Sequence, residues 1–503
     1  MKNLADKHVL VLGLGDSGLA LARWCARWGA QVTVADTRAE PPQGEALQAS
    51  VPSARFMHGD LGAALLDGAA FDMLLKSPGL SPSSVAGVVS AAQARGITCG
   101  NELSLFAQAL IDLKADKSYA PQVIGITGTN GKTTVTSLTG QLVQRAGKTV
   151  AVAGNIGPTL LDTLAEKIDA DSLPEVWVLE LSSFQLDGIK NFEPLVATVL
   201  NITQDHLDWH GTFEAYGAAK NNVYGAGGLM LLNRNDPLVM TAVPVQVKGK
   251  PARNYLTFGH DEPQRPGDYG IEAVNGMAWL VRASEADETI KRKRGHSSAV
   301  SEDVELHIQR LMPVDALRIH GRHNATNALA ALGLAQAAGC ALGPMLHGLR
   351  EYKGEPHRVE SVAVINNVEY FDDSKGTNVG ATVAALAGLG AERKLVLILG
   401  GVGKDQDFSP LALPASRFAR AVVLIGRDAA LIGAALENSA VTLLAAESMQ
   451  EAVSLAAQQA QPGDAVLMSP ACASFDMFDN YEHRARVFCE VVHALALEEG
   501  VLP

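Results

Sequence analysis

The sequence predicts an α/β protein with three domains, each built around a mostly parallel sheet. Short apolar runs rich in β-branched residues alternate with alanine-rich amphipathic segments along the chain, which is typical of parallel α/β layers. Two glycine-rich loops each follow an apolar run and open a helical segment. The length of 503 residues argues against a single core, because domains usually hold roughly 100–200 residues. We expect the domains to span residues 1–110, 111–353 and 354–503.

Composition excludes several classes of protein. The formal net charge of −13 gives no general attraction to nucleic acid or to an anionic membrane. No uncharged apolar stretch approaches the roughly 18 residues that span a bilayer, so we expect a cytoplasmic protein and not an integral membrane protein. The five cysteines lack CxxC spacing, which argues against a disulfide framework or a structural zinc site and predicts reduced thiols. They are Cys25, Cys99, Cys340, Cys472 and Cys489.

The first domain opens with the strand HVLVLG and the loop GLGDSG, and its second strand, QVTVAD, ends at Asp36. Taken alone, this spacing suggests an NAD-binding fingerprint. Glycines at a helix N-terminus also offer backbone N–H groups to other pyrophosphates, including that of a UDP-sugar. A glycine turn without a ligand is the alternative. The candidate nucleotide contacts are Gly15, Asp16, Ser17, Asp36, Thr37, Arg38, Ser77, Pro78 and Gly79.

The second domain opens with GITGTNGKTT, which looks like a phosphate-binding loop but has Ile126 where the common pattern has glycine. The loop still lies between an apolar strand and a helical segment. Lys132, expected to be an exposed loop lysine, can neutralise phosphate oxygens, and the Thr133 hydroxyl can ligate Mg²⁺. A structural turn, the alternative, would not need a lysine at the helix start. The candidate ATP contacts in the loop are Gly128, Thr129, Asn130, Gly131, Lys132, Thr133 and Thr134.

Later segments of this domain add candidate metal ligands. The apolar run VWVLELSSFQL carries Glu180 into the interior, which is costly unless the carboxylate binds a metal or another cation. The segment NITQDHLDWHG places Asp205 and His206 after another strand, and Lys220 follows in AYGAAK. A solvated loop is the alternative for this cluster.

Side-chain amides also gather at the ends of elements in this domain. Asn155 lies in GNIG, and Asn324 and Asn327 of GRHNATNALAA share one face of a predicted helix. This concentration of amides makes a solvated loop less favoured for the neighbouring polar cluster.

Residues 283–303, ASEADETIKRKRGHSSAVSED, are polar and weakly patterned, which predicts a surface insertion. The basic run Lys291–Arg294 could contact an acidic partner. Its acidic neighbours offset the charge, however, and favour a solvated loop.

The third domain follows Gly354 and Pro356, which break a helical pattern and indicate a hinge. The strands KLVLILGG, AVVLIG and AVLMSP are each followed by a loop and a helix. Polar groups in the loops of this domain include Asp373, Lys404 and Ser474. Taken singly, Asp373 and Ser474 could cap the helices that follow, and Lys404 could be an ordinary solvated lysine.

Several motifs together resemble a known family. TGTNGKTT, ELSSFQL, NITQDHLDWHG and GRHNATNALAA, in this order, resemble the Mur ligase superfamily of ATP-dependent amide-forming enzymes. PHRVE, FDDSKGTNVGAT, LILGGVGKDQDF and LMSPACASFDMFDNYEHRARVF resemble the branch that adds D-glutamate to UDP-N-acetylmuramoyl-L-alanine. The resemblance covers nearly the whole chain apart from residues 283–303. It implies a Rossmann-like UDP-binding domain, a central P-loop-type ATPase domain and a C-terminal Rossmann-like domain.

The resemblance also implies a reaction. ATP would phosphorylate the L-alanyl carboxylate, and the amine of D-glutamate would attack the acyl phosphate through a tetrahedral intermediate, in cytoplasmic peptidoglycan precursor synthesis. Because a carboxylate attacks an ATP anion, Lys132, two Mg²⁺ and His206 are expected to shield the charge. The implied partners are ATP, D-glutamate and the UDP-substrate. We expect no nucleic-acid partner, and we expect a monomer, although no sequence feature identifies the oligomeric state.

Residue roles are carried over by the same resemblance. The implied catalytic residues are Lys132, His206, Lys220 and Lys375. The implied metal ligands are Thr133, Glu180, His206 and Lys220, the last after carbamylation by CO₂. Further ATP contacts are Asn324, Arg358 and Asp373, and further UDP-substrate contacts are Asn155 and Ser182. The implied D-glutamate contacts are Lys375, Thr377, Lys404, Ser474 and Tyr481.

Other activities stay open at this point. A sibling ligase that adds a different amino acid and a folylpolyglutamate-type ligase share the central motifs and differ in the first and third domains. A nucleotide-sugar-binding regulator with an inactive ATP fold is an alternative from another class.

Overall fold

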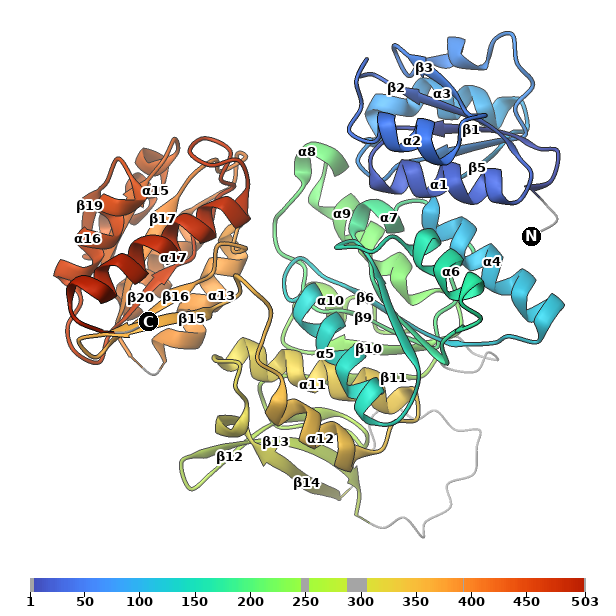
Figure 1. The fold of residues 1–503 in the computed structure, drawn as a ribbon. Helices are drawn as coiled ribbons and strands as arrows, with labels where there is room; N and C mark the ends of the chain where they lie inside the picture. Colours follow the sequence, from blue (N-terminus) through green and yellow to red (C-terminus); the bar gives the residue numbers. More distant parts are fainter. Residues whose placement is uncertain (1–3, 246–252, 287–304, 392, 502–503) are drawn as a thin grey trace.

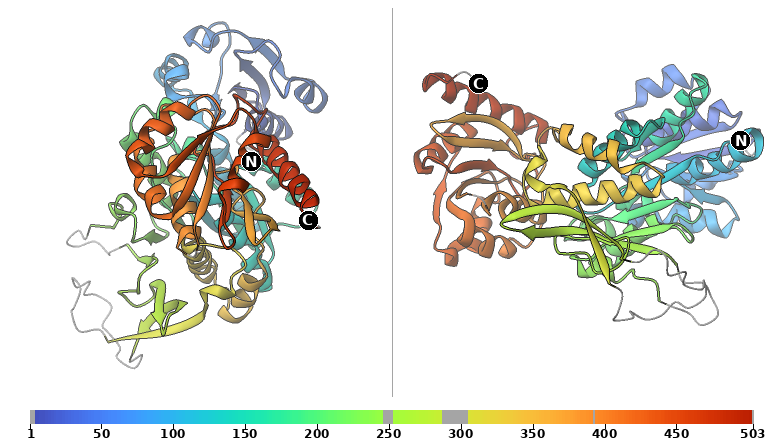
Figure 2. Two further views of the ribbon diagram at one scale, coloured as in Figure 1. Left: turned by 90° about the vertical axis from the view of Figure 1, so that its left-hand side faces the viewer. Right: turned by 90° about the horizontal axis from the view of Figure 1, so that it is seen from below.

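The computed structural model describes residues 4–245, 253–286, 305–391 and 393–501. These residues form three α/β bodies, with the central one between the N-terminal and C-terminal ones (Figures 1 and 2). Three of the sheets are parallel or nearly so. The predicted fold class is confirmed.

The N-terminal domain has one parallel sheet with the strand order β3-β2-β1-β4-β5. The apolar residues of β1 and β4 are buried on both faces, which places these strands in the middle of the sheet. Their carboxyl ends lie side by side where the strand order reverses, the usual ligand position in such sheets. The elements are β1 (His8–Leu12), α1 (Asp16–Arg27), β2 (Gln31–Asp36), α2 (Gly44–Ser50), β3 (Arg55–His58), β4 (Met73–Lys76), α3 (Pro82–Ala94) and β5 (Thr98–Gly100).

Helix α4 (Glu102–Lys117) crosses the boundary predicted near residue 110. The predicted boundary between residues 110 and 111 therefore falls inside a helix. The helix begins at a capping box formed by Asn101 and Ser104. It packs against α1 and against α6 (Leu160–Asp169) of the central domain. Residues 114–117, in the last turn of this helix, are exposed.

The central domain holds a parallel sheet with the order β11-β10-β9-β6-β8-β7. Its elements are β6 (Gln122–Thr127), α5 (Lys132–Arg145), β7 (Val150–Gly154), α6 (Leu160–Asp169), β8 (Val176–Glu180), α7 (Ser183–Leu186), β9 (Val196–Val199), α8 (Leu207–His210), α9 (Phe213–Asn221), β10 (Leu229–Asn233), α10 (Pro237–Met240), β11 (Tyr255–Phe258), α11 (Arg322–Ala337) and α12 (Leu342–Glu351). The strand predicted before the phosphate loop is confirmed as β6, and the apolar run that carries Glu180 forms β8 and then α7. Helices α11 and α12 pack against α5.

A small antiparallel sheet, β12-β13-β14, projects from the central domain and was not predicted (Figure 1). Its strands are β12 (Tyr269–Val274), β13 (Met277–Glu285) and β14 (Leu306–Pro313). The first three residues of the predicted insertion belong to β13, and Ala283 is buried, so the insertion was placed too early. The basic run Lys291–Arg294 lies outside the described residues.

The C-terminal sheet has the order β15-β16-β20-β17-β18-β19, and only the edge strand β15 is antiparallel to its neighbour. The elements are β15 (Glu360–Ile365), β16 (Val368–Asp372), α13 (Val379–Gly390), β17 (Leu395–Gly400), α14 (Ala412–Phe418), β18 (Ala419–Ile425), α15 (Ala429–Leu436), β19 (Thr442–Ala445), α16 (Met449–Gln459), β20 (Ala465–Met468) and α17 (Tyr481–Glu498). Residues 352–359 connect α12 to this domain and include Gly354 at φ +93°.

All five cysteines are free thiols, as predicted. Among the described residues, no helix is both long enough and apolar enough to cross a membrane.

Replacing Gly18 with alanine should destabilise the N-terminal domain. A Cβ at Gly18 would lie 2.0 Å from the backbone oxygen of Gly13, so α1 would have to move away from β1. We expect the free energy of unfolding, measured by urea denaturation, to fall by about 1–3 kcal/mol. Gly15→Ala is the control, because a Cβ there meets nothing within 4 Å. Equal effects of the two substitutions would contradict the packing role of Gly18.

Candidate active site

Asn201 fixes the shape of the predicted phosphate loop. The loop joins β6 to α5, and Asn201 follows the neighbouring strand β9. The backbone oxygen of Asn201 accepts a hydrogen bond from the Thr129 amide at 2.9 Å, and its Oδ1 accepts one from the Asn130 amide at 2.8 Å. Gly128 at φ +153° and Gly131 at φ +82° adopt backbone conformations that favour glycine. The loop leads into the N-terminus of α5, a position suited to phosphate.

Lys132 is the first residue of α5 and is half-buried, so the prediction of an exposed loop lysine is wrong. Its Nζ donates to the backbone oxygens of Gly128 at 2.9 Å and Thr129 at 2.8 Å. Burial lowers the pKa of Lys132, although the charges of Glu180 and Asp205 oppose this shift. The side chain folds back onto its own loop, which sequence spacing could not show.

Glu180 ends β8 and is 1% exposed. Its Oε1 accepts a hydrogen bond from Nδ2 of Asn155 at 3.0 Å, while Asn155 itself is exposed. Within the described parts of the chain, Oε2 has no hydrogen-bond partner. A buried carboxylate oxygen without a partner is costly, and a bound cation would remove that cost.

Lys220 lies on α9 directly beneath the phosphate loop and is 1% exposed. Its Nζ donates to the backbone oxygen of Gly128 at 2.9 Å and lies 4.5 Å from the centre of the Tyr216 ring. Burial, with a contribution from the positive charge of Lys132, lowers the pKa of Lys220 well below its usual value. The shift favours the neutral amine, although the charges of Asp205 and Glu180 oppose it.

His206 precedes α8 and adopts a left-handed conformation at φ +53°. The Nε2 atom of His206 lies 3.6 Å from Oδ2 of Asp205, and the negative charge of Asp205 raises the pKa of His206. Burial lowers the pKa of His206, and the positive charge of Lys404 adds to this effect. A neutral imidazole suits metal binding better than the charge shielding that we expected of this residue.

The C-terminal domain contacts the phosphate loop directly. Arg358 donates from Nη2 to Oγ1 of Thr133 at 2.6 Å. Asn378 donates to Oδ1 of Asn130 at 3.1 Å and accepts from its Nδ2 at 3.3 Å. Asn378 also donates to Oδ2 of Asp205 at 3.4 Å. Thr133, a predicted metal ligand, thus already accepts a hydrogen bond from another domain.

Two cavities lie along the seam between the central and C-terminal domains. One has a volume of about 100 Å³ and brings together predicted ATP contacts, namely Asn130, Gly131, Thr134, Asn324, Arg358 and Asp373, together with Lys375. The other, of about 310 Å³, shares Asn324 and Arg358 and reaches the connection at Lys353–Pro356. Asn324 accepts a hydrogen bond from Asn327 at 3.1 Å, which confirms that the two amides share one face of α11.

Asp373 and Lys375 follow β16 and have opposite pKa shifts. Asp373 accepts a hydrogen bond from Ser469 at 2.6 Å, and burial raises its pKa to about 7. Nζ of Lys375 lies 3.6 Å from the centre of the Tyr481 ring, and burial lowers its pKa to about 8. Asn378, not Asp373, caps helix α13.

The other residues predicted to contact D-glutamate lie in loops at the carboxyl ends of neighbouring strands. Thr377 is half-buried after β16, Lys404 is exposed after β17, and Ser474 is buried after β20. The helix cap predicted as an alternative for Ser474 is instead Asn480. The exposure of Lys404 agrees with a solvated lysine, yet its charge acts on His206.

In the N-terminal domain, the Asp36 carboxylate holds the glycine loop. It accepts hydrogen bonds from the Leu14 amide at 2.7 Å and from the Arg38 amide and guanidinium at 2.8–2.9 Å. The Arg38 hydrogen bond is the main cause that lowers the pKa of Asp36 to about 2. Both carboxylate oxygens therefore already accept hydrogen bonds within the protein, which the prediction of Asp36 as a nucleotide contact did not include.

The remaining predicted UDP-substrate contacts are spread over two domains. Asp16 accepts a hydrogen bond from Gln43 at 2.7 Å, and Ser182 caps α7. Gly15, Ser17 and Pro78 are half-buried, Ser77 is buried, and Thr37 and Gly79 are exposed.

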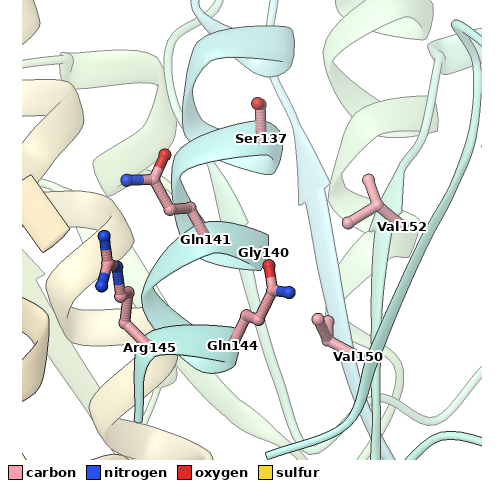
Figure 3. Close-up of a pocket in the computed structure, with 7 residues that line it drawn as sticks. All are labelled: Ser137, Gly140, Gln141, Gln144, Arg145, Val150 and Val152. Atoms are coloured by element: carbon pink, nitrogen blue, oxygen red, sulfur yellow. The ribbon is translucent and has the colours of Figure 1, made fainter. Parts of the chain in front are cut away.

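A groove of about 910 Å³ lies elsewhere, between α5 and β7 (Figure 3). It contains none of the residues predicted for the site, and its arginine is paired with Glu351. Cavity size alone therefore does not locate the active site. The groove is lined by Ser137, Gly140, Gln141, Gln144, Arg145, Val150 and Val152.

Sequence analysis missed the residues that hold the site in place. Asn201 and Asn378 shape or contact the phosphate loop, and Ser469 supports Asp373. The first two lie inside the quoted motifs NITQDHLDWHG and FDDSKGTNVGAT, and the third lies in the quoted segment LMSPACASFDMF. Their polar character next to strand ends was the feature that could have identified them.

Three family models match successive parts of the chain. The Mur ligase MurD-like N-terminal domain matches residues 7–100, the Mur ligase middle domain matches 126–335, and the Mur ligase glutamate ligase domain matches 357–472.

Named relatives match over almost the entire chain. UDP-N-acetylmuramoylalanine--D-glutamate ligase of Albidiferax ferrireducens is 65% identical over 504 residues, covering 99% of this chain and 98% of the relative. The enzyme of the same name from Polaromonas sp. is 58% identical over 592 residues and covers 100% of both chains. That of Ralstonia nicotianae is 55% identical over 506 residues and covers 99% of both.

Solved structures share the fold at lower identity. MurF ligase from Thermotoga maritima in complex with ADP aligns with a TM-score of 0.56 at 17% identity, covering 99% of this chain and 97% of the other. A pseudomurein peptide ligase type C from Methanothermus fervidus aligns at 0.53 with 18% identity, covering 97% and 100%. Because the family matches follow the order of the three domains and the close relatives span nearly every residue, this chain belongs to the Mur ligase family.

Proposed function

We propose that this chain is an ATP-dependent ligase that joins D-glutamate to UDP-N-acetylmuramoyl-L-alanine in peptidoglycan precursor synthesis. The geometry that carries the proposal is the contact of the C-terminal domain with the phosphate loop, through Arg358 and Asn378. This contact brings the loops of one domain beside the nucleotide loop of another, as a reaction between ATP, a carboxylate and an amine requires. The names of relatives that are 55–65% identical support D-glutamate as the amino acid.

The proposed first step is attack of the L-alanyl carboxylate on the γ-phosphorus of ATP. A carboxyl oxygen–phosphorus bond forms, the bond from phosphorus to the β,γ-bridging oxygen breaks, and ADP leaves. Because both reactants are anions, positive charge must lie close to them. Lys132 lies at the N-terminus of α5. Its Nζ could exchange its hydrogen bonds to the backbone oxygens of the loop for contacts with the phosphate oxygens. Lys375 lines the same seam from the C-terminal domain.

The proposed second step forms the amide. The neutral amine of D-glutamate attacks the acyl carbon and forms a carbon–nitrogen bond. Collapse of the tetrahedral intermediate breaks the carbon–oxygen bond to phosphate, which leaves, and the nitrogen loses one proton to solvent. The side chains proposed to hold D-glutamate come from one domain, while the phosphate loop comes from another. The connection at residues 352–359, which includes Gly354, is proposed to let the C-terminal domain close and exclude water from the acyl phosphate. The proposed D-glutamate contacts are Lys375, Thr377, Lys404, Ser474 and Tyr481.

Glu180, Thr133, His206 and modified Lys220 are proposed to hold two Mg²⁺. The fit rests on the buried Oε2 of Glu180, which has no partner among the described residues, and on the lowered pKa of His206. When bound, the ions would neutralise charge on the phosphoryl oxygens.

Lys220 is proposed to react with CO₂. Its neutral nitrogen attacks the carbon of CO₂, a nitrogen–carbon bond forms, and one N–H proton is released to solvent. The product is a carbamate anion, which can ligate cations as a carboxylate does. The lowered pKa supports the reaction, because only the neutral amine is nucleophilic.

Every residue in the proposed site comes from one chain, so we propose that a monomer is sufficient for the reaction. A cytoplasmic location is proposed as well, because the reaction consumes ATP and a nucleotide-linked precursor.

Phosphate release should require both UDP-N-acetylmuramoyl-L-alanine and D-glutamate in the presence of ATP and Mg²⁺. The measurement is released phosphate for each candidate precursor with a panel of D- and L-amino acids. Equal turnover with L-glutamate would contradict the proposed function, and preference for another amino acid would assign a sibling activity. Binding of the UDP-substrate without turnover would indicate a regulator.

Lys220→Ala should lower kcat by about 100-fold, because a proposed ligand to the metal is lost. Added formate or acetate should restore part of the activity by entering the vacated space as an anion. Lys190→Ala, which removes an exposed lysine of the same domain, is the control. Its kcat should equal that of the unsubstituted enzyme and should not rise when formate or acetate is added. Normal turnover by Lys220→Ala would rule out the carbamate.

The KM for D-glutamate should rise above about pH 8. Burial, with the nearby charge of Arg358, lowers the pKa of Lys375 to about 8. The ammonium of Lys375 is therefore present at pH 7. It is lost as the pH rises through about 8, and its attraction for a carboxylate is lost with it. Lys375→Arg should keep a low KM to higher pH, because a guanidinium stays charged. Identical pH profiles for the two enzymes would contradict this role.

A further inference from the structure

One lysine of the N-terminal domain contacts two short helices of the central domain. Lys76 is the last residue of β4, and its side chain is 13% exposed. Its Nζ lies 3.6 Å from Oδ2 of Asp187 and 4.9 Å from the centre of the Trp209 ring. Asp187 directly follows α7, and Trp209 belongs to α8. A single cation thus links β4 to both helices.

Aromatic rings continue this contact from Trp209 to His206. Phe184 of α7 packs against Trp209 with ring centres 4.5 Å apart and against His206 with ring centres 4.7 Å apart. Trp209 is 8% exposed, and its indole N–H has no hydrogen-bond partner in the described part of the chain. The position of the Trp209 ring therefore depends on ring packing and on Lys76, not on a hydrogen bond.

The other end of this connection is the loop proposed to contact the UDP-substrate. Lys76 is bonded directly to Ser77, the first residue of that loop, and Ser77 is anchored by its amide to the backbone oxygen of Leu12 at 2.9 Å. A cavity of about 550 Å³ between the two domains is lined by Lys76 and Asp187. Because packed side chains do not fill this space, the contact of Lys76 with Asp187 is an important link between the two domains at this part of the interface.

We propose that Lys76 is a positioning residue that sets the N-terminal domain, and with it the UDP-substrate, at the correct distance from the reacting phosphate. The proposal rests on the proposed function. The carboxylate and the γ-phosphorus must approach to roughly 3–3.5 Å for reaction, so a small shift of one domain slows the chemistry. Lys76 acts on the reaction through Trp209, Phe184 and His206, without touching a reactant.

The test compares substitutions at both ends of the contact. Lys76→Met keeps the length of the side chain and removes the charge, Trp209→Leu removes the ring, and a double variant combines them. Lys76→Arg keeps a cation over the ring. Lys7→Met is the matched control, because Lys7 pairs with Asp72 at 3.0 Å in the same domain but is half exposed.

Lys76→Met should lower kcat by about 2- to 30-fold, the range for loss of a cation–π contact, while the KM for ATP changes by less than about twofold. Lys76→Arg should recover most of kcat. The double variant should be no slower than the slower single variant, because both changes break one connection. Losses that multiply in the double variant, or a Lys76→Met enzyme indistinguishable from Lys7→Met, would overturn the proposal.

A second readout does not depend on activity. In protein labelled with ¹⁵N-histidine, the His206 resonances, assigned with His206→Gln, should shift in Lys76→Met and stay unchanged in Lys7→Met. A lysine that only stabilises the fold would lower the unfolding temperature without moving these resonances, and that result would refute the positioning role. If the unsubstituted enzyme fails to release phosphate with D-glutamate, the proposed function fails, and the resonances still decide whether Lys76 acts on His206.

Discussion

Burial of ionisable side chains beneath the phosphate loop is the constraint on which the rest of the site depends. Glu180 and Lys220 are each 1% exposed, and the hydrogen-bond partners of both are neutral: Asn155 for the acid and the Gly128 carbonyl for the lysine. Burying a charge without an opposite charge is costly. Burial accordingly lowers the pKa of the lysine and favours its neutral form, and one oxygen of the acid keeps no partner among the described residues. The carboxylate is therefore suited to binding a cation, and the amine is suited to reaction with CO₂.

The flanking domains reach this buried centre by different means. The C-terminal domain contacts the phosphate loop through hydrogen bonds of Arg358 and Asn378. The N-terminal domain packs through α1 and α4 against α6 and extends Lys76 toward α8. The hinge proposed at Gly354 would suit a domain that must bind and release substrates, whereas a packed helical interface suits one that holds a substrate in register.

Much of the fold followed from local sequence patterns, because apolar runs mark buried parallel strands wherever they occur. The strands ending at Leu12, Thr127 and Glu180 are examples. Helix α4 and the antiparallel sheet β12-β13-β14 were missed, since their residues are partly exposed and carry a weak hydrophobic pattern. The site motifs were visible, but their mutual contacts were not: Arg358 bonds Thr133 across 225 positions of the chain. No local sequence pattern shows that two residues so far apart in the chain are in contact. No local pattern shows that Lys132 is half-buried either.

Carbon-13 NMR of the protein equilibrated with ¹³C-labelled bicarbonate tests the state of the buried centre most directly. The proposed reaction of Lys220 with CO₂ predicts a carbamate resonance in the unsubstituted protein, absent from Lys220→Ala and retained in Lys190→Ala. A spectrum of the unsubstituted protein that lacks this resonance at saturating CO₂, with Lys220 still buried and the protein folded, would contradict the assignment of Lys220 as a modified ligand.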